Sequence, residues 1–278
     1  MKLLTGLAVS AALLAGCADK SADVAVEVVA EADIAVVVAQ PAAPASMFVE
    51  YMYCDGGADF SRENYAQLTA AWNEINDQSA TPVAGAFSIV PQVESELYDG
   101  MWANIWSSVE ARDAGWADWA ENQAEAFGEK FDSTMVCNPE KTFLFETTPL
   151  VAPMQQWDPA NLFQASYNFC SFKEGKTPED GALAQTALGG WMTDQRAAGR
   201  GTNYMSYLQI PTFDPATAGG SMQAYQFVRA DFWASAEEQA ADMAAWMLEG
   251  NAARELSDAT YDCQNASFDL YSIKRLAS

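Results

Sequence analysis

Two stretches of 22 residues decide the fold, because the second is a version of the first. Residues 98–119 read YDGMWANIWSSVEARDAGWADW, and residues 225–246 read YQFVRADFWASAEEQAADMAAW. Three aromatic residues recur at a shift of 127 positions: Tyr98, Trp106 and Trp119 return as Tyr225, Trp233 and Trp246. Each stretch has a strand-like run, a short polar break and then apolar residues at helical spacing. We therefore interpret the chain as a duplication whose copies can be used to interpret each other.

The first copy, residues 47–150, is predicted to have the element order βαββαβ. Its strands are expected where β-branched and aromatic residues concentrate, at 47–54, 83–90, 97–107 and 143–147. Ser61 is suited to cap a helix, since apolar residues follow at helical spacing. Apolar residues between positions 116 and 131 predict a second helix.

The second copy, residues 151–278, repeats this order. Strands are expected at 162–170, 203–210, 222–233 and 267–274. Thr177 followed by Pro178 predicts a helix start, and Ser235 with Glu238 has the spacing of a capping box. The shift between matching positions grows from 116 to 127, and it changes only within predicted loops. This is the behaviour that a duplication predicts.

Four cysteines fall at matching positions of the two copies. Cys54 matches Cys170, and Cys137 matches Cys263. Four cysteines allow three pairings, and the repeat favours one disulfide within each copy, Cys54–Cys137 and Cys170–Cys263. A cysteine metal site is the alternative, but no CxxC motif or histidine accompanies these residues. We predict no metal and no cofactor.

This order of elements resembles the dimeric α+β barrel superfamily, which includes antibiotic-biosynthesis-monooxygenase-like and haem-degrading proteins. The resemblance covers about residues 47–276 and rests on topology. It implies an α+β fold in which two tandem ferredoxin-like repeats pair their sheets as a pseudo-dimeric barrel. It also implies the strand order 4-1-3-2 in each repeat, which places each cysteine pair on neighbouring strands.

The N-terminus predicts export. Residues 1–16 have the form of a signal peptide, and Leu14-Ala15-Gly16-Cys17 resembles the bacterial lipobox, which makes Cys17 the site of lipidation, including palmitate. An ordinary secretory signal is the alternative. Ala18 after the cysteine favours the outer membrane, facing the periplasm. Residues 17–46, rich in Ala, Val and acidic residues, are predicted to be a tether; an additional strand is the alternative.

Charge and composition exclude several functions. A formal net charge of −24 disfavours nucleic acid and anionic membrane surfaces as partners, so the membrane is contacted through the lipid anchor only. The absence of histidine excludes Ser-His-Asp and Cys-His catalysis, histidine-ligated zinc and haem with a proximal histidine.

Alternation along the third strands separates two faces. Ala103 and Ala230 belong to a small apolar face, which we expect to contact the helices. We expect the opposite, polar-aromatic face to line the barrel as a ligand cavity. The candidate ligand-binding residues on it are Glu50, Tyr98, Trp102, Asn104, Trp106, Asn168, Tyr225, Arg229, Asp231 and Trp233.

A structural explanation of this face remains open. Trp102, Trp106 and Trp233 could simply form core, and Arg229 with Asp231 has the spacing of an ion pair. Glu50 would need a partner if it were buried, and Arg229 is the partner we expect.

Two classes of function remain. The first is an exported, lipid-anchored protein that binds a small apolar or aromatic ligand, or a partner protein of the cell envelope. The alternative is a cofactor-independent monooxygenase or isomerase of the dimeric α+β barrel type. The sequence does not decide whether the protein is an enzyme.

Overall fold

The computed structural model describes residues 47–154, 163–218 and 225–274. The predicted signal peptide, lipidated Cys17 and tether lie outside the described residues.

The first half runs from residue 47 to residue 151. Its elements are β1 (Met47–Gly56), α1 (Arg62–Gln78), β2 (Gly85–Pro91), β3 (Gly100–Trp106), α2 (Val109–Asn122), α3 (Ala124–Phe131) and β4 (Met135–Val151). The Ser61 hydroxyl accepts from the Asn64 N–H at 3.1 Å and caps α1, as predicted. Residues 116–131 form two helices rather than one, because Gln123 leaves the helical conformation with a φ of −129°.

The second half runs from residue 163 to residue 274. Its elements are β5 (Phe163–Phe172), α4 (Pro178–Ala197), β6 (Met205–Pro211), α5 (Pro215–Ala218), β7 (Phe227–Trp233), α6 (Ala236–Glu249), α7 (Asn251–Thr260) and β8 (Tyr261–Lys274). Thr177 and Asp180 form a complete capping box at α4. The predicted box at Ser235 is only half formed. Ser235 caps α6, but the Glu238 carboxylate accepts from Asn203 at 2.7 Å instead.

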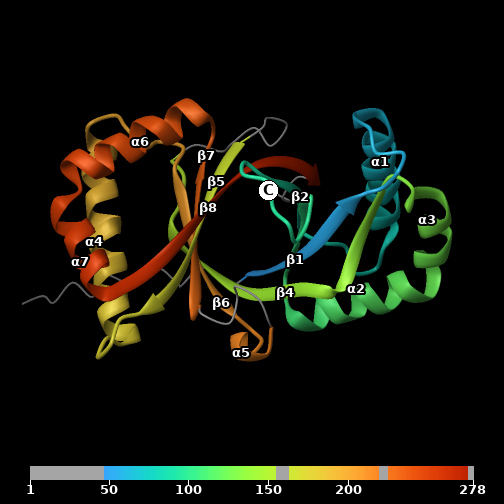
Figure 1. The fold of residues 1–278 in the computed structure, drawn as a ribbon, viewed down its shortest axis with the longest axis horizontal. Helices are drawn as coiled ribbons and strands as arrows, with labels where there is room; N and C mark the ends of the chain where they lie inside the picture. Colours follow the sequence, from blue (N-terminus) through green and yellow to red (C-terminus); the bar gives the residue numbers. More distant parts are fainter. Residues whose placement is uncertain (1–46, 155–162, 219–224, 275–278) are drawn as a thin grey trace, which may run out of the picture. The chain divides into compact units, whose positions relative to one another are not determined.

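The eight strands close into one antiparallel barrel in the order β1-β3-β2-β8-β5-β7-β6-β4. Within the first half the order is β4-β1-β3-β2, and within the second it is β8-β5-β7-β6. The halves join where β2 pairs with β8 and β4 pairs with β6. Helices α1, α2 and α3 cover the barrel on one side, and α4, α6 and α7 cover it on the other (Figure 1). Among the described residues, no helix is both long and apolar enough to cross a membrane.

The assignment of the two strand faces was wrong. The barrel interior holds the small apolar face, including Ala103, Ile105, Val228 and Ala230, together with Tyr51 and other aromatic residues of both halves. The polar-aromatic face points outward beneath the helices, where Trp102 packs with residues of α1 and α3. The reason is the space available, because a closed eight-stranded barrel admits interdigitating side chains but little more. Indoles and carboxylates find room and hydrogen-bond partners in the layer between sheet and helices.

Both predicted disulfides are present. Cys54 is bonded to Cys137 and ties β1 to β4, while Cys170 is bonded to Cys263 and ties β5 to β8. In each case the two cysteines face each other across neighbouring antiparallel strands. Such bonds persist in the oxidising compartments that exported proteins enter.

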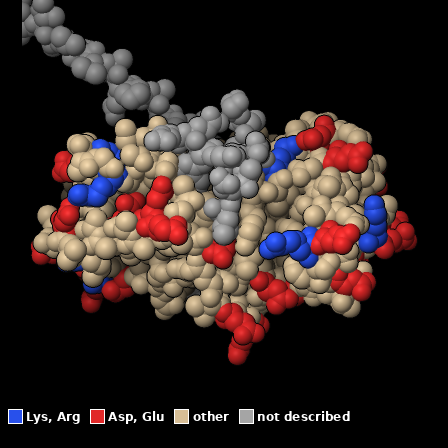
Figure 2. All heavy atoms as spheres, turned by 90° about the horizontal axis from the view of Figure 1, so that it is seen from above, with Lys and Arg blue, Asp and Glu red and all other residues tan. Residues whose placement is uncertain are grey.

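Acidic residues outnumber basic ones by 38 to 14 in the chain. Acidic side chains are spread over the face drawn in Figure 2, and the basic ones there are few and dispersed. That face offers no basic patch for a nucleic acid.

Candidate functional site

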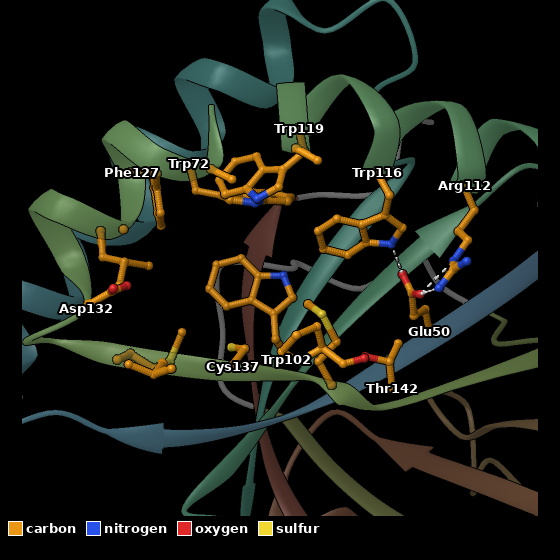
Figure 3. A pocket seen from close by; sticks show the side chains of 18 residues that line it. Glu50, Trp72, Trp102, Arg112, Trp116, Trp119, Phe127, Asp132, Cys137 and Thr142 are labelled. Atoms are coloured by element: carbon orange, nitrogen blue, oxygen red, sulfur yellow. Dashed lines mark hydrogen bonds and ion pairs between the residues drawn. The ribbon is translucent and has the colours of Figure 1, made fainter. Parts of the chain in front are cut away.

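A large cavity lies between the sheet of the first half and its helices. Its volume is about 550 Å³, within the usual range for small-molecule sites. Four indoles line it: Trp72 from α1, Trp102 from β3, and Trp116 and Trp119 from α2. In Figure 3 Trp102 stands up from the sheet and the other three come down from the helices. The cavity therefore presents aromatic surface from above and below.

The buried carboxylate of Glu50 forms the polar end of this cavity. Its side chain is 0% exposed, and α2 supplies most of the partners for it. Oε1 accepts from Arg112 Nε at 2.7 Å and also from Nη2. Oε2 accepts from Trp116 Nε1 at 2.7 Å and from Trp106 Nε1 at 3.1 Å. Four donors fill the acceptor sites of the carboxylate, so Glu50 has no free lone pair with which to take a substrate proton.

Arg112 is held by two carboxylates. Besides Glu50, it binds exposed Asp113 through Nη1 at 2.9 Å. Burial lowers the pKa of Arg112, but the hydrogen bonds to Asp113 and Glu50 outweigh it and leave the pKa raised. The guanidinium is thus a fixed positive charge, 29% exposed, at the cavity wall. We had expected Arg229 to pair with Glu50, and this was wrong, because the two residues point into separate helix layers on opposite halves of the barrel.

The opposite end of the cavity is apolar apart from its rim. Phe127 of α3 and Met135 of β4 line it, together with Cys137 of the first disulfide, and the exposed Asp132 lies at its edge (Figure 3). Trp102 donates from Nε1 to Asn104 at 2.9 Å, which fixes the orientation of the indole on the sheet. The first disulfide holds β1 and β4 together at this end.

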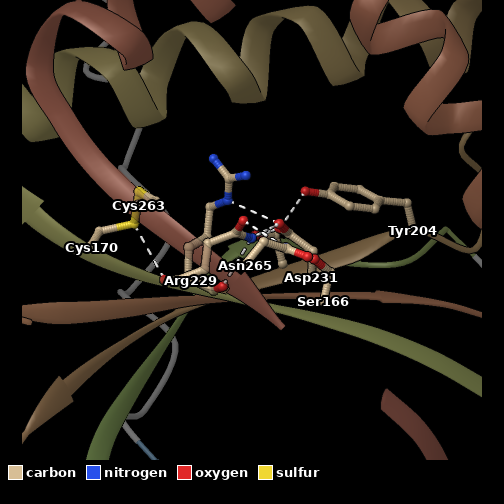
Figure 4. Close-up of polar contacts among 9 residues, drawn as sticks. Ser166, Cys170, Tyr204, Arg229, Asp231, Cys263 and Asn265 are labelled. Atoms are coloured by element: carbon tan, nitrogen blue, oxygen red, sulfur yellow. Dashed lines mark hydrogen bonds and ion pairs between the residues drawn. A yellow bond between two sulfur atoms is a disulfide. The ribbon is translucent and has the colours of Figure 1, made fainter. Parts of the chain in front are cut away.

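The second half carries a comparable but much smaller cavity of about 60 Å³. Its buried centre is Asp231, which accepts from four donors. The hydroxyls of Tyr204 and Ser206 each lie at 2.7 Å, Asn168 at 2.8 Å and Arg229 Nε at 3.0 Å (Figure 4). The predicted Arg229–Asp231 ion pair is therefore present.

The two buried carboxylates lie in equivalent cross-strand pairs of the two halves, but each is on the other strand of its pair. Glu50 of β1 faces Asn104 of β3, whereas Ser166 of β5 faces Asp231 of β7. By the repeat, Glu50 matches Ser166, and Asn104 matches Asp231. Each half thus has one carboxylate in this facing pair, on the outer face of its sheet.

The ten predicted ligand-binding residues divide into three groups. Glu50 and Trp102 line the large cavity, and Asn104 and Trp106 line a hollow of about 40 Å³ that shares Trp72, Trp116 and Trp119 with it. The residues Asn168, Arg229, Asp231 and Trp233 line the small cavity of the second half. Tyr98 and Tyr225 line neither cavity, since Tyr98 packs against Tyr53 and Tyr225 packs against Phe169.

Arg112 is the important residue that we did not predict, although a signal for it was available. It follows the capping Ser108 by four positions and precedes Trp116 by four, so both side chains lie on one helix face. Among the described residues, no group of three or more histidine, cysteine, aspartate or glutamate side chains could hold a metal ion.

No protein-family profile and no curated protein matches the sequence. Solved structures with a similar fold include an anthrone oxidase-like protein (12% identity, TM-score 0.47, covering 84% of this chain and 96% of that one). A variant of chlorite dismutase from Candidatus Nitrospira defluvii is similar at 9% identity, with a TM-score of 0.46 and coverage of 82% and 92%. A heme-binding protein from Thermus thermophilus is similar at 11% identity, with a TM-score of 0.44 and coverage of 82% and 91%. The element order and the strand pairing themselves make the chain an α+β protein with a closed eight-stranded antiparallel barrel.

Proposed function

We propose that the cavity of the first half binds a flat, mostly apolar ligand with aromatic character. The observation that carries this proposal is a cavity of about 550 Å³ walled by four indoles. Indoles offer large, rigid apolar faces that stack on planar molecules. The filled hydrogen bonds of Glu50 make it an anchor for Trp116 and Arg112, which favours binding over proton transfer.

The test compares two tryptophans at matching positions of the copies. Trp72→Ala should weaken binding of 1-naphthol, followed by quenching of tryptophan fluorescence, by about tenfold or more, since it removes one wall of the cavity. Trp191→Ala, the matched control in the second half, should leave the affinity unchanged. Equal affinities of the wild type and both folded variants would contradict the proposal. Native mass spectrometry of the purified protein would identify a retained ligand.

A second candidate function is cofactor-independent oxygenation or isomerisation of the same ligand. The feature in its favour is the Arg112 guanidinium at the cavity wall, which could stabilise negative charge on a substrate oxygen. Turnover of a quinol by the wild type, lost in Arg112→Met with binding retained, would support an enzyme. Binding without turnover would support the first candidate.

We further propose that the protein is exported and anchored to the outer membrane through Cys17. The lipobox-like sequence after the apolar run supports this proposal. Cys17→Ser should move the protein from the membrane fraction to the soluble one, or leave an unprocessed precursor. Unchanged fractionation would contradict it.

We also propose that the two halves are tandem ferredoxin-like repeats derived by duplication. The same strand order in both halves and the matching disulfides support this.

A further inference from the structure

Two side chains that line the small cavity of the second half carry hydrogen-bond donors with no acceptor among the described residues. Arg229 uses Nε for Asp231, while its terminal nitrogens Nη1 and Nη2 make no hydrogen bond (Figure 4). The indole N–H group of Trp191 lines the same cavity, is buried and also lacks a partner. A buried donor without an acceptor is costly, so the Trp191 indole beside the free end of the Arg229 guanidinium indicates an acceptor that the chain does not supply.

The carboxylates nearby do not satisfy these donors. Asp231 already accepts from four groups, so its acceptor sites are occupied. Asp242 of α6 also lines the cavity. Burial raises the pKa of its carboxyl, and a hydrogen bond from the neighbouring Trp233 indole only partly offsets this effect. A carboxyl with a raised pKa opposes a bound anion less than an ordinary aspartate does.

The first half shows which group such donors bind. Trp106, which matches Trp233, donates to Glu50 at 3.1 Å. In the second half the position of Glu50 is taken by Ser166, and the carboxylate of Asp231 is engaged elsewhere. A carboxylate is therefore the group that an arginine and indole N–H groups bind together in the first half.

We propose that the small cavity is a second ligand site, which binds the carboxylate of a small organic acid. Nη1 and Nη2 of Arg229 form a planar fork that matches the two oxygens of a carboxylate. Figure 4 shows this guanidinium rising from the sheet toward the helices, with its terminal nitrogens turned away from Asp231. The side chain is 21% exposed, so a ligand can reach it. A cavity of about 60 Å³ suits an acid of acetate size rather than the larger ligand of the first half.

The test titrates the purified protein with acetate at constant ionic strength and follows the indole N–H resonances by nuclear magnetic resonance. Trp191 and Trp233 should shift saturably, and Trp72 should not. Acetamide and chloride should bind at least about tenfold more weakly, because neither offers two charged oxygens to the fork. Arg229→Lys should weaken acetate binding by about tenfold, since it keeps the charge but removes the fork.

Trp191→Phe keeps the aromatic wall and removes one donor, so it should weaken acetate binding several-fold without loss of fold. Trp72→Phe is its matched control in the first half and should leave acetate affinity unchanged. Equal responses to acetate and chloride, or unchanged acetate affinity in Trp191→Phe and Arg229→Lys, would overturn the proposal and leave water as the partner of these donors. Neither result depends on whether the large cavity binds an aromatic ligand.

Discussion

At the scale of single residues, the molecule is organised around two buried carboxylates, each saturated by four donors. For Glu50 these are two nitrogens of Arg112 and two indoles, so its removal would leave a guanidinium and buried N–H groups without an acceptor. An unsatisfied buried group costs more free energy than its hydrogen bond contributes when made. Both sites should therefore tolerate substitution poorly.

Glu50→Gln tests this directly. The amide puts an N–H₂ group where one oxygen now accepts two hydrogen bonds, and it removes the charge opposite Arg112. We expect a loss of about 3 kcal/mol in the free energy of unfolding, measured with urea. Glu146→Gln is the control, because Glu146 is exposed on β4, and it should change stability by less than about 0.5 kcal/mol. A loss below about 1 kcal/mol in Glu50→Gln would show that the four hydrogen bonds are not formed in solution.

Arg229→Met should destabilise the protein by a similar amount. The substitution leaves Asp231 buried without its cation, while Tyr204, Ser206 and Asn168 still donate to it. We expect about 3 kcal/mol, at the lower end of the cost of breaking a buried ion pair. Thermal and urea unfolding would measure it. A neutral or stabilising result would mean that Asp231 becomes protonated or reaches water when Arg229 is gone.

At the scale of elements, the disulfide between β1 and β4 is the feature that most directly affects the large cavity. Cys137 lines its apolar end, and the disulfide to Cys54 closes a loop with a sequence separation of 83. Cross-linking such a loop limits the freedom of the unfolded chain. The bond therefore stabilises the fold and keeps the two strands in contact beside the cavity.

A double variant, Cys54→Ser with Cys137→Ser, should lose up to about 4 kcal/mol of stability. The matched pair Cys170→Ser with Cys263→Ser should lose a similar amount, because its sequence separation is 93. Only the first variant should also weaken 1-naphthol binding when both are compared under conditions that keep them folded. Equal effects of the two double variants on 1-naphthol binding would show that the Cys54–Cys137 disulfide does not shape the large cavity.

Elements also show what could be predicted from the sequence and what could not. The spacing of the repeated tyrosines, tryptophans and cysteines predicted the order of elements and the disulfides, because these depend on local patterns and on one comparison within the chain. Which face of each strand points into the barrel could not be predicted. Alternation separates Trp102 from Ala103, but it does not say which side the barrel encloses. The partner of Glu50 was missed because Arg112 follows it by 62 positions, a contact that only the packing of α2 on the sheet creates.

At the scale of the whole molecule, the barrel interior joins the halves through polar as well as apolar contacts. Tyr51 of the first half donates to Tyr167 of the second at 3.3 Å, and Gln209 donates to Tyr51 at 2.7 Å. Burial raises the pKa of Tyr51 to about 12 and that of Tyr167 well above its usual range, although the hydrogen bonds that Tyr51 makes with Tyr167 and Gln209 oppose the rise in the pKa of Tyr51. Both phenols therefore stay neutral in the folded protein under moderately alkaline conditions.

This predicts loss of stability between pH 10 and 12. In the unfolded chain Tyr51 ionises near pH 10, whereas in the folded protein it ionises only near pH 12. The stability linked to the neutral phenol is complete below pH 10 and falls by about 1 kcal/mol per pH unit as the pH rises toward 12. Urea unfolding at pH 9, 10 and 11 should show a smaller decline in Tyr51→Phe than in the wild type. Tyr271→Phe, at an exposed position of β8, is the control and should decline like the wild type. The same decline of stability with pH in all three proteins would contradict the link between this decline and the ionisation of Tyr51.

The exchange of carboxylate between strands bears on how the two halves diverged. If both descend from one ancestral repeat, the charge moved from one member of a facing pair to the other in one of the copies. A single substitution cannot do this. The intermediate form had either two acids opposite each other or none, and either state would have disturbed the arginine and indoles around it. Each carboxylate is therefore bound to its own set of donors, and moving it across the strands within either half would require new partners as well as two substitutions.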